Sequence, residues 1–335
     1  MARAFPDAPI YTSMFDGEIV GDLFPNRTIH TSFLQHLPGR KRYFRWYAPL
    51  YPRVFESFDL REYDVILSSS SAWAKGVRCR PDAVHVSYLH AVSRFVAAYD
   101  AYLGGLGVGR IARPIVNRLI SWDVQAAQRP TRLLANSENV AADIARFYGR
   151  CATVVHPPVD LNRCMVGPGA GGYFFIASRL LPYKRIDIAI EAAIKANVRL
   201  IISGDGPSGD ALREQARNSK VEFLGFIDDA SVVEFMRNAT AVIVPGSEDF
   251  GLVPIEAAAC GRPTLAFGAG GALQTVIPTV TGLFFSDTAE LTELLETFDA
   301  STFDPIALRT HAEKFGTSAF SERLRAIVTE TIASS

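Results

Sequence analysis

Short apolar runs of strand length alternate with stretches of helical periodicity along most of the chain. This alternation is typical of a parallel sheet covered by helices. In the first half we expect buried strands at residues 63–68, 83–88 and 132–135. The third strand leads into a predicted helix that begins after Ser137, a favourable N-cap, and ends at Gly149, a favourable stop.

The same alternation begins again in the second half, after a turn-rich segment. Residues 165–172 (MVGPGAGG) interrupt the pattern and, with residues 156–158 (HPP), form our candidate linker. Beyond it we expect a second doubly wound unit, with strands 173–177, 199–203, 221–224, 241–245 and 264–267 and helices 186–195 and 254–260. The length of 335 residues also suits two domains. We therefore place domains at residues 1–165 and 166–317, followed by a last helix within residues 318–335.

The composition excludes several classes of protein. With 48% hydrophobic and 21% charged residues, the chain is neither disordered nor fibrous. Its four cysteines show no C-x-x-C spacing, so we expect no zinc site and no disulfide scaffold. No apolar run approaches the roughly 20 residues that span a bilayer, and residues 1–7 lack a signal-peptide pattern. The expected location is therefore the cytoplasm.

The formal net charge of −1 conceals two halves of opposite sign. Residues 1–165 contain 20 Lys and Arg against 14 Asp and Glu, a charge of +6, and the rest of the chain carries −7. Residues 37–53 alone contribute +5 and also hold five aromatic residues. This segment suits an anionic membrane surface, single-stranded nucleic acid that stacks on the rings, or a helix packed by its aromatics with a solvated cationic face.

Polar residues follow the predicted strands of the second half, where ligands of open α/β sheets collect. Ser178 and Arg179 come directly after one strand and Lys184 lies five positions beyond, a pair of cations that suits a diphosphate. The alternative is a solvated surface pair. After the next strand, Gly204 opens the turn GDGP, which either brings the backbone close to a ligand or is a simple turn.

The segment 245–261 (PGSEDFGLVPIEAAACG) carries the strongest signal. Its helix should begin near Pro254, so that the amides of Gly251 and Leu252 face outward at the positive end of the helix dipole, where an anion binds. Glu248 before the helix and Glu256 in its first turn bracket that position and could accept hydrogen bonds from sugar hydroxyls. The alternative is a loop charge and an ordinary first-turn acid.

Five separated segments together resemble the donor half of the family 4 retaining glycosyltransferases: Ser178-Arg179-Leu180, Lys184-Arg185-Ile186-Asp187, Gly204-Asp205-Gly206-Pro207, Phe223-Leu224-Gly225-Phe226 and residues 248–256 (EDFGLVPIE). Their order and spacing both fit. The first half resembles the mannosyltransferase branch through Tyr88-Leu89-His90 with Arg94, Ser121-Trp122-Asp123 and Ala135-Asn136-Ser137. The closest resemblance is therefore to transferases that use GDP-mannose.

The resemblance implies a GT-B fold, in which two Rossmann-like domains face each other across a cleft, with the nucleotide sugar on the second and the acceptor on the first. It implies no metal and no cofactor other than the nucleotide-sugar substrate. The implied catalytic residues are Arg179 and Lys184 on the diphosphate, Glu248 on the donor sugar and His90 near that sugar. The implied donor-binding residues are Ser178, Gly204, Phe226 near the base, Phe250, Gly251, Leu252 and Glu256 on the ribose hydroxyls.

The resemblance also implies a retaining transfer of a hexose to a glycan or lipid-linked acceptor in cell-surface polysaccharide synthesis. Given this resemblance, residues 37–53 favour peripheral docking on an anionic membrane, and nucleic acid is not an expected partner. The last helix should return to the first domain. The rival hypotheses are a catalytically weak nucleotide-sugar-binding or scaffold protein, and a transferase that uses a UDP-sugar.

The sequence departs from the family at three places. Residues 1–11 resemble the end of the first helix and the second strand, so we expect the first strand and its glycine-rich loop to be absent. Gln274 stands where relatives commonly carry an acid, which puts that donor contact in doubt. His90 is followed by Ala91 and Val92 instead of Thr and Pro.

Overall fold

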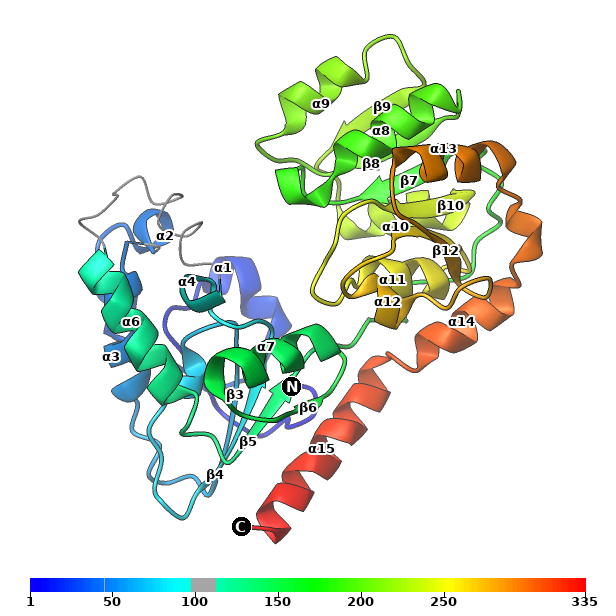
Figure 1. The fold of residues 1–335 in the computed structure, drawn as a ribbon. Coiled ribbons are helices and arrows are strands. Elements are labelled where there is room, and N and C mark those ends of the chain that lie inside the picture. The colour runs from blue at the N-terminus through cyan, green and yellow to red at the C-terminus, as the bar shows by residue number, and fades with distance from the viewer. Residues whose placement is uncertain (45, 98–112) are drawn as a thin grey trace. The chain divides into compact units, whose positions relative to one another are not determined.

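The computed structural model describes residues 1–44, 46–97 and 113–335. They form two compact units, one of residues 1–155 with 321–335 and the other of residues 156–320 (Figure 1). Each unit is built around its own parallel sheet.

The second unit contains a six-stranded parallel sheet with the order β12-β11-β10-β7-β8-β9. Its central strands are short apolar runs buried on both faces, as parallel sheets require. The strands are β7 (Phe174–Ala177), β8 (Leu200–Ser203), β9 (Val221–Gly225), β10 (Ala241–Val244), β11 (Thr264–Phe267) and β12 (Gly282–Phe285). The five strands predicted from the sequence are all confirmed within one residue at either end.

Helices cover both faces of this sheet, and a separate apolar cluster fills each side. One face packs against α8 (Ile186–Lys195), α9 (Gly209–Gln215) and α13 (Thr288–Thr297). The other packs against α10 (Asp229–Asn238), α11 (Val253–Ala259) and α14 (Pro305–Glu313) (Figure 1). Short segments at η6 (Pro182–Lys184), α12 (Ala272–Thr275) and η7 (Ala300–Thr302) complete the unit. The arrangement confirms the predicted doubly wound unit.

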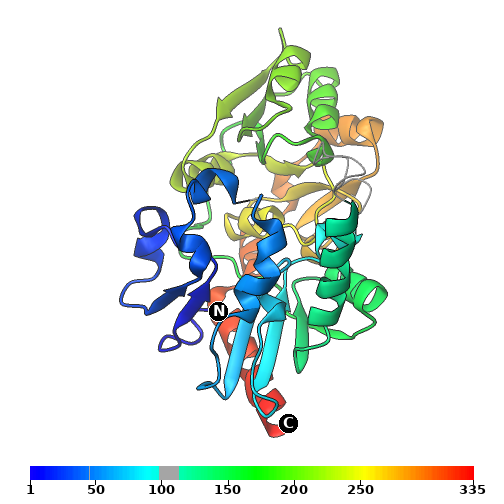
Figure 2. The ribbon, with the colours of Figure 1, turned by 90° about the vertical axis from the view of Figure 1, so that its left-hand side faces the viewer.

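The first unit contains a parallel sheet with the order β3-β4-β5-β6 and, apart from it, the parallel pair β1-β2 (Figure 2). The strands are β1 (Ile10–Thr12), β2 (Ile29–Thr31), β3 (Val65–Ser70), β4 (Val84–Leu89), β5 (Arg132–Ala135) and β6 (Ala152–Val154). The longer helices are α6 (Arg113–Ala126) and α7 (Glu138–Tyr148), and the shorter ones are α1 (Gly17–Val20), α2 (Arg40–Tyr43), α3 (Tyr51–Glu56) and α4 (Arg94–Ala97). Short 3₁₀ segments are η1 (Gly21–Leu23), η2 (Phe33–His36), η3 (Ala48–Leu50) and η4 (Ala74–Gly76).

The limits of α7 are those that its sequence predicts. The Ser137 side chain accepts a hydrogen bond from Val140 N at 3.2 Å, and Gly149 ends the helix with a φ of 65°. By contrast, β3 begins at Val65 and not at residue 63. Tyr63 belongs to a turn, because its amide bonds to Leu60 O and its hydroxyl lies 3.1 Å from that of Tyr11.

The boundary between the units lies ten residues before the predicted one, at residues 155/156 in place of 165/166. The turn-rich segment is therefore not a free linker. Val159 N bonds to Phe315 O, Gly167 N bonds to Cys260 O and Gly171 N bonds to Asn238 O, so backbone hydrogen bonds attach the segment to the second unit. Cys164 is buried in that unit's core. The glycines that looked like linker residues permit this close backbone packing.

The last helix, α15 (Thr317–Ala333), begins in the second unit, and its residues from Ser321 onward belong to the first (Figure 2). Arg325 Nε donates to Ala4 O at 2.9 Å, and Arg132 forms an ion pair with Glu330 at 3.2 Å. Among the described residues, no helix is both long and apolar enough to cross a bilayer.

Candidate functional site

The strand order of the second unit locates its ligand edge. From β7 the chain adds β8 and β9 on one side and then β10, β11 and β12 on the other, so the connections diverge between β7 and β10. At such a switch point the loops after the two strands part and leave a crevice. A hollow lies there, lined by Ile176, Ala177, Ser178, Lys184, Ile243, Val244, Pro245, Gly246, Glu248 and Val253. Three of the predicted site residues thus line one hollow.

Lys184 and Glu248 form an ion pair across this hollow. Lys184 Nζ lies 2.5 Å from Glu248 Oε1, and the side chains are 14% and 23% exposed. Gly246 makes the close approach possible, since a Cβ there would lie 2.8 Å from Lys184 Cα. Gly246 is not among the site residues predicted from the sequence, although a Pro-Gly pair directly after a buried strand is a signal for such an approach. The pair is partly open to solvent, so an anion could reach the ammonium group.

The turn after β8 supports the loop after β7. Ser178 N bonds to Ser203 O at 3.1 Å, and Gly204 has a φ of 126°. A Cβ at Gly204 would lie 1.9 Å from Ser178 O, so only glycine fits. Gly204 therefore shapes the loop that carries Ser178 and Arg179. The Arg179 side chain is exposed and begins two residues after β7 ends.

Glu256 lies in the first turn of α11 and is held by a residue that the sequence analysis missed. Arg163 donates one Nη2 hydrogen bond to Glu256 Oε1 and one from Nη1 to Asp229 Oδ2 at 2.9 Å. Burial raises the pKa of the Glu256 carboxyl, and the Arg163 guanidinium opposes that rise. Arg163 is 93 positions away in the chain, so no local pattern could have revealed it.

The loop before α11 separates residues that support the site from residues that face solvent. Phe250 is 4% exposed and stacks on His156 with ring centroids 4.9 Å apart. Its ring therefore holds the loop from beneath, and its predicted contact with a donor is not visible in this packing. Gly251 has a φ of 80°, and Leu252 O accepts hydrogen bonds from Ile255 N and Glu256 N at the start of the helix. Phe226, after β9, is 86% exposed and free to meet a ligand.

His90 belongs to the first unit and follows β4 directly. Its Nε2 lies 2.9 Å from Ser69 Oγ, and its ring meets that of Tyr88 edge-on at 5.1 Å. The imidazole is exposed at the surface, yet the surrounding protein removes part of its hydration and lowers its pKa. His90 is therefore neutral near pH 7, with one ring nitrogen as donor and the other as acceptor.

Residues 37–53 divide into a packed part and an exposed part. Tyr51 is 9% exposed and stacks on Trp73 with centroids 5.5 Å apart. Tyr43, Phe44 and Trp46 are 46%, 43% and 74% exposed. The interpretation as a helix packed by its aromatics thus holds for Tyr51 and for the half-buried Tyr47, which packs against the same apolar cluster, and fails for the other three. Lys41 and Arg45 contribute to the predicted charge, but the side chain of Lys41 and the whole of Arg45 lie outside the described residues.

Comparison with protein families gives two matches that follow the division of the chain. Residues 168–317 match the family described as "Glycosyl transferases group 1". Residues 8–163 match the family described as "Glycosyltransferase Family 4". The first match includes every predicted donor-side residue, and the second includes His90 and residues 37–53.

A curated relative, D-inositol 3-phosphate glycosyltransferase 2 of Catenulispora acidiphila, is 29% identical in an alignment of length 254 that covers 65% of this chain and 57% of the relative. The D-inositol 3-phosphate glycosyltransferase of Mycobacterium bovis is 29% identical over 67% of this chain and 51% of its own length. This chain thus spans about half the length of the curated relatives that it matches.

Among solved structures, Anabaena HepE in complex with UDP and glucose is similar with a TM-score of 0.71 and 20% identity, over 98% of this chain and 93% of that one. At this identity the likeness shows the fold alone. The fold is the two-domain α/β GT-B fold with parallel sheets, which confirms the fold class predicted from the sequence.

Proposed function

We propose that the chain is a family 4 glycosyltransferase that transfers a hexose from a nucleotide sugar to an acceptor hydroxyl with retention of the anomeric configuration, because residues 8–163 and 168–317 match two glycosyltransferase family models. The observation that supports this most strongly is the hollow at the switch point, where Ser178, Lys184 and Glu248 meet within the segment that matches the family. In open α/β sheets this is the position where nucleotide ligands bind.

The proposed roles follow from the chemistry of a departing nucleotide diphosphate. Negative charge develops on the diphosphate in the transition state, and fixed cations and amides at that place lower the barrier. Lys184, already held by Glu248 at 2.5 Å, and the exposed Arg179 would supply the cations. The Gly251 and Leu252 amides would assist them. With these groups in place of a metal ion, turnover should persist in excess EDTA.

The remaining donor-side roles concern the sugars and the base. Glu256, fixed by Arg163, would accept hydrogen bonds from the ribose hydroxyls. Glu248 would contact the transferred hexose through its second carboxylate oxygen. Phe226, 86% exposed after β9, would stack on the base. His90 of the first unit would act near the transferred sugar from the acceptor side.

The donor that we favour is GDP-mannose, because the first half resembles the mannosyltransferase branch at Tyr88-Leu89-His90 and at Ser121-Trp122-Asp123. A UDP-sugar is the second candidate, and a specific observation favours it: HepE was solved with UDP and glucose. The exposed Phe226 stacks on either base and does not discriminate between them. The proposed acceptor is a glycan or a lipid-linked hydroxyl, and inositol 3-phosphate belongs in the acceptor panel because of the names of the curated relatives.

A donor screen tests the proposal. Purified protein is incubated with GDP-mannose, UDP-glucose and UDP-N-acetylglucosamine, with and without acceptors, and release of the free nucleotide is followed. Binding of GDP and UDP is measured in parallel by calorimetry. Turnover that disappears in Lys184→Ala but persists in Lys195→Ala, whose lysine pairs with Glu191 on the surface, supports a transferase. Tight nucleotide binding without turnover for any donor would favour the binding or scaffold protein instead.

We further propose that the exposed part of residues 37–53 docks on an anionic membrane surface. Tyr43, Phe44 and Trp46 offer aromatic rings at the depth of lipid headgroups, and Arg40, Arg42 and Arg53 supply cations for lipid phosphates. Sedimentation with vesicles containing phosphatidylglycerol should carry the protein down at low salt and release it at high salt. Phe44→Ser with Trp46→Ser should weaken this binding, whereas Ile306→Ser, at a site 73% exposed on α14, should not. Failure to sediment at any salt concentration would remove this proposal.

A further inference from the structure

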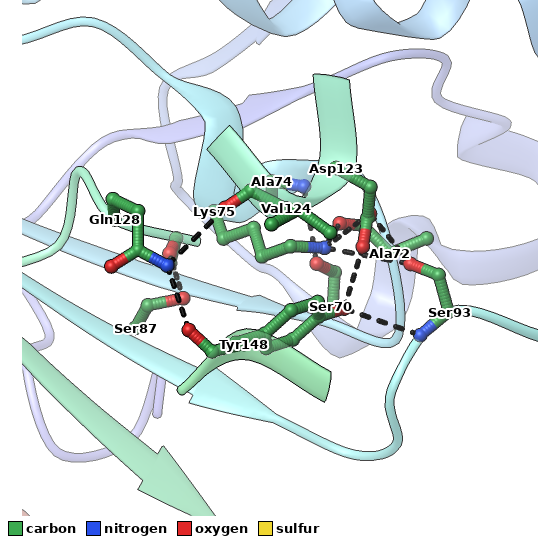
Figure 3. A network of polar contacts seen from close by, with 11 residues as sticks. Ser70, Ala72, Ala74, Lys75, Ser87, Ser93, Asp123, Val124, Gln128 and Tyr148 are labelled. Carbon is green, nitrogen blue, oxygen red and sulfur yellow. Dashed lines mark hydrogen bonds and ion pairs between the residues drawn. The ribbon is translucent and has the colours of Figure 1, made fainter. Parts of the chain in front are cut away.

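The first unit contains a completely buried ion pair that the proposed chemistry does not use. Lys75 Nζ lies 2.6 Å from Asp123 Oδ1, and both side chains are 0% exposed (Figure 3). Burying an ammonium and a carboxylate is costly unless each is paired and fully hydrogen-bonded. A role for the pair of Lys75 and Asp123 has to be sought in the structure that surrounds it.

The two charges are satisfied on every side by the surrounding polar groups. Asp123 Oδ1 accepts from Ser93 Oγ at 2.7 Å, and Oδ2 accepts from Tyr148 OH at 2.6 Å. Lys75 also donates to Ala72 O, and its ammonium lies 5.3 Å from the centre of the Tyr148 ring. We call Lys75, Ser93, Asp123 and Tyr148 the Lys75 cluster. Figure 3 shows these side chains pointing toward one another. All four residues are buried, so the cluster has no surface that could receive a ligand.

The Lys75 cluster joins four separate elements. Lys75 lies in η4 after β3, Ser93 lies in the loop after β4, Asp123 lies on α6 and Tyr148 lies on α7. Apolar side chains of similar volume often replace a buried ion pair without loss of stability. Hydrogen bonds, unlike apolar contacts, fix the orientation of the loops that they join, and an apolar replacement would lose this. The two loops that are joined follow the carboxyl ends of adjacent parallel strands, which is the ligand edge of this sheet.

His90 lies between the two tethered points. On one side, His90 N bonds to Ser70 O at 3.2 Å, and Ser70 Oγ accepts from Ala74 N at 3.1 Å, directly before Lys75. On the other side, three residues after His90, Ser93 bonds to Asp123 through its hydroxyl and to Tyr148 OH through its amide at 3.4 Å. The imidazole itself meets Ser69 on the same strand end.

We propose that the Lys75 cluster is a positioning device that fixes the strand-end loops of the first unit and so sets the place and the hydrogen bonding of the His90 imidazole. Lys75, Ser93, Asp123 and Tyr148 are positioning residues, because none of them is exposed to a substrate. The consequence for turnover rests on the proposed function, in which His90 acts near the transferred sugar. The consequence for the His90 side chain does not.

Ser93→Ala tests the device with the least disturbance, since it leaves the ion pair intact and removes the hydroxyl tie between Asp123 and the His90 loop, while the Ser93 amide still meets Tyr148 OH. The matched control is Ser121→Ala on α6, whose hydroxyl bonds to Asn117 O at 3.1 Å. The titration of His90 is followed by NMR on protein with labelled histidine, its signal being assigned with His90→Gln. In Ser93→Ala the His90 pKa should move up toward the free value while Ser121→Ala leaves it in place. With an active donor, kcat should fall by about tenfold to a hundredfold and the Kd of the nucleotide should not change.

A second variant is tested because the rest of the Lys75 cluster could compensate for the loss of the Ser93 hydroxyl. Lys75→Met with Asp123→Val removes both charges, fills both positions with apolar side chains and should remain folded by circular dichroism. We expect the His90 signal and kcat to change at least as far as in Ser93→Ala. The proposal is overturned if both variants are folded and their His90 titration and kinetics match those of Ser121→Ala. If the unmodified chain transfers no sugar, the proposed function fails, while the His90 titration still decides the present inference.

Discussion

Two of the lysine–carboxylate pairs in the described part of the chain are nearly equal in length and opposite in character. Lys75 and Asp123 lie 2.6 Å apart and are fully buried, whereas Lys184 and Glu248 lie 2.5 Å apart and are 14% and 23% exposed. The first pair is surrounded by a hydroxyl from Ser93 and another from Tyr148. The second lies in a hollow at the ends of two strands. The two distances differ by only 0.1 Å, so the environment must account for the difference between the pairs.

The difference shows how to separate a structural charge from one that is available for chemistry. A buried pair with every hydrogen-bonding position filled can neither exchange partners nor admit a ligand, so its effect is on the folded structure around it. A pair at an open crevice keeps part of its hydration, and its ammonium can turn from the carboxylate to a phosphate at modest cost. Breaking the first pair should therefore reduce stability, and breaking the second should reduce activity.

The largest expected effect is the loss of stability in Asp123→Ala. Removing the carboxylate leaves the Lys75 ammonium buried without a counter-ion, which typically costs about 3–5 kcal/mol of unfolding free energy. All three tryptophans, Trp46, Trp73 and Trp122, belong to the first unit, so their fluorescence in urea reports its unfolding. The control is Asp59→Ala in the same unit, whose exposed pair with Arg61 should contribute little to stability. Equal urea midpoints for the two variants would show that breaking the buried pair costs no more stability than breaking an exposed pair.

The next effect concerns activity and should appear in Lys184→Ala. If this ammonium stabilises the departing diphosphate, turnover should fall by roughly 10²–10³, as it does when one such group is removed from an active site. The urea midpoint should change little, because the pair is partly exposed and Glu248 regains water. Lys195→Ala, at a pair 2.7 Å long on the surface of α8, should leave both quantities unchanged. If Lys184→Ala lost stability and kept its turnover, the pair of Lys184 and Glu248 would be structural and not functional.

Much of the second unit could be predicted from the sequence for a physical reason. Its strands are short apolar runs because both faces of the sheet are buried, and Ser178, Lys184 and Glu248 stand out because they follow those runs directly. The Lys75 cluster could not be predicted in this way. Asp123 is 48 positions from Lys75 and 25 from Tyr148, so only the folded chain brings them together. The boundary was misplaced because glycines that serve close packing look the same in a sequence as glycines of a linker.

Arg163 also forms ion pairs with carboxylates, and its replacement should have a smaller effect than that of Asp123 or Lys184. Arg163 holds Glu256 and Asp229 but is itself 38% exposed. In Arg163→Gln the charge-assisted hydrogen bond to Glu256 is lost, so the donor KM and the nucleotide Kd should rise by about tenfold with kcat little changed. Arg199→Gln, at an exposed pair with Glu222, is the control. The difference between Arg163→Gln and the unmodified chain should shrink for nucleotides without ribose hydroxyls, and an undiminished difference would argue against a role at the ribose.

The smallest expected effect is the pH dependence of nucleotide binding. Burial raises the pKa of Glu256 above its usual 4.5, and the carboxylate must be ionised to accept hydrogen bonds from two ribose hydroxyls. Binding should therefore be complete at neutral pH and weaken as the pH falls through this raised pKa, which lies above that of an ordinary surface glutamate. In Arg163→Gln the opposing positive charge is gone while Asp229 remains, so the pKa rises further and the acid limb moves to higher pH. Calorimetry with GDP and UDP between pH 5 and 8 at constant ionic strength measures how the affinity falls toward acid pH. If the affinity falls over the same pH range in Arg163→Gln and in the unmodified chain, Arg163 does not govern the charge of Glu256.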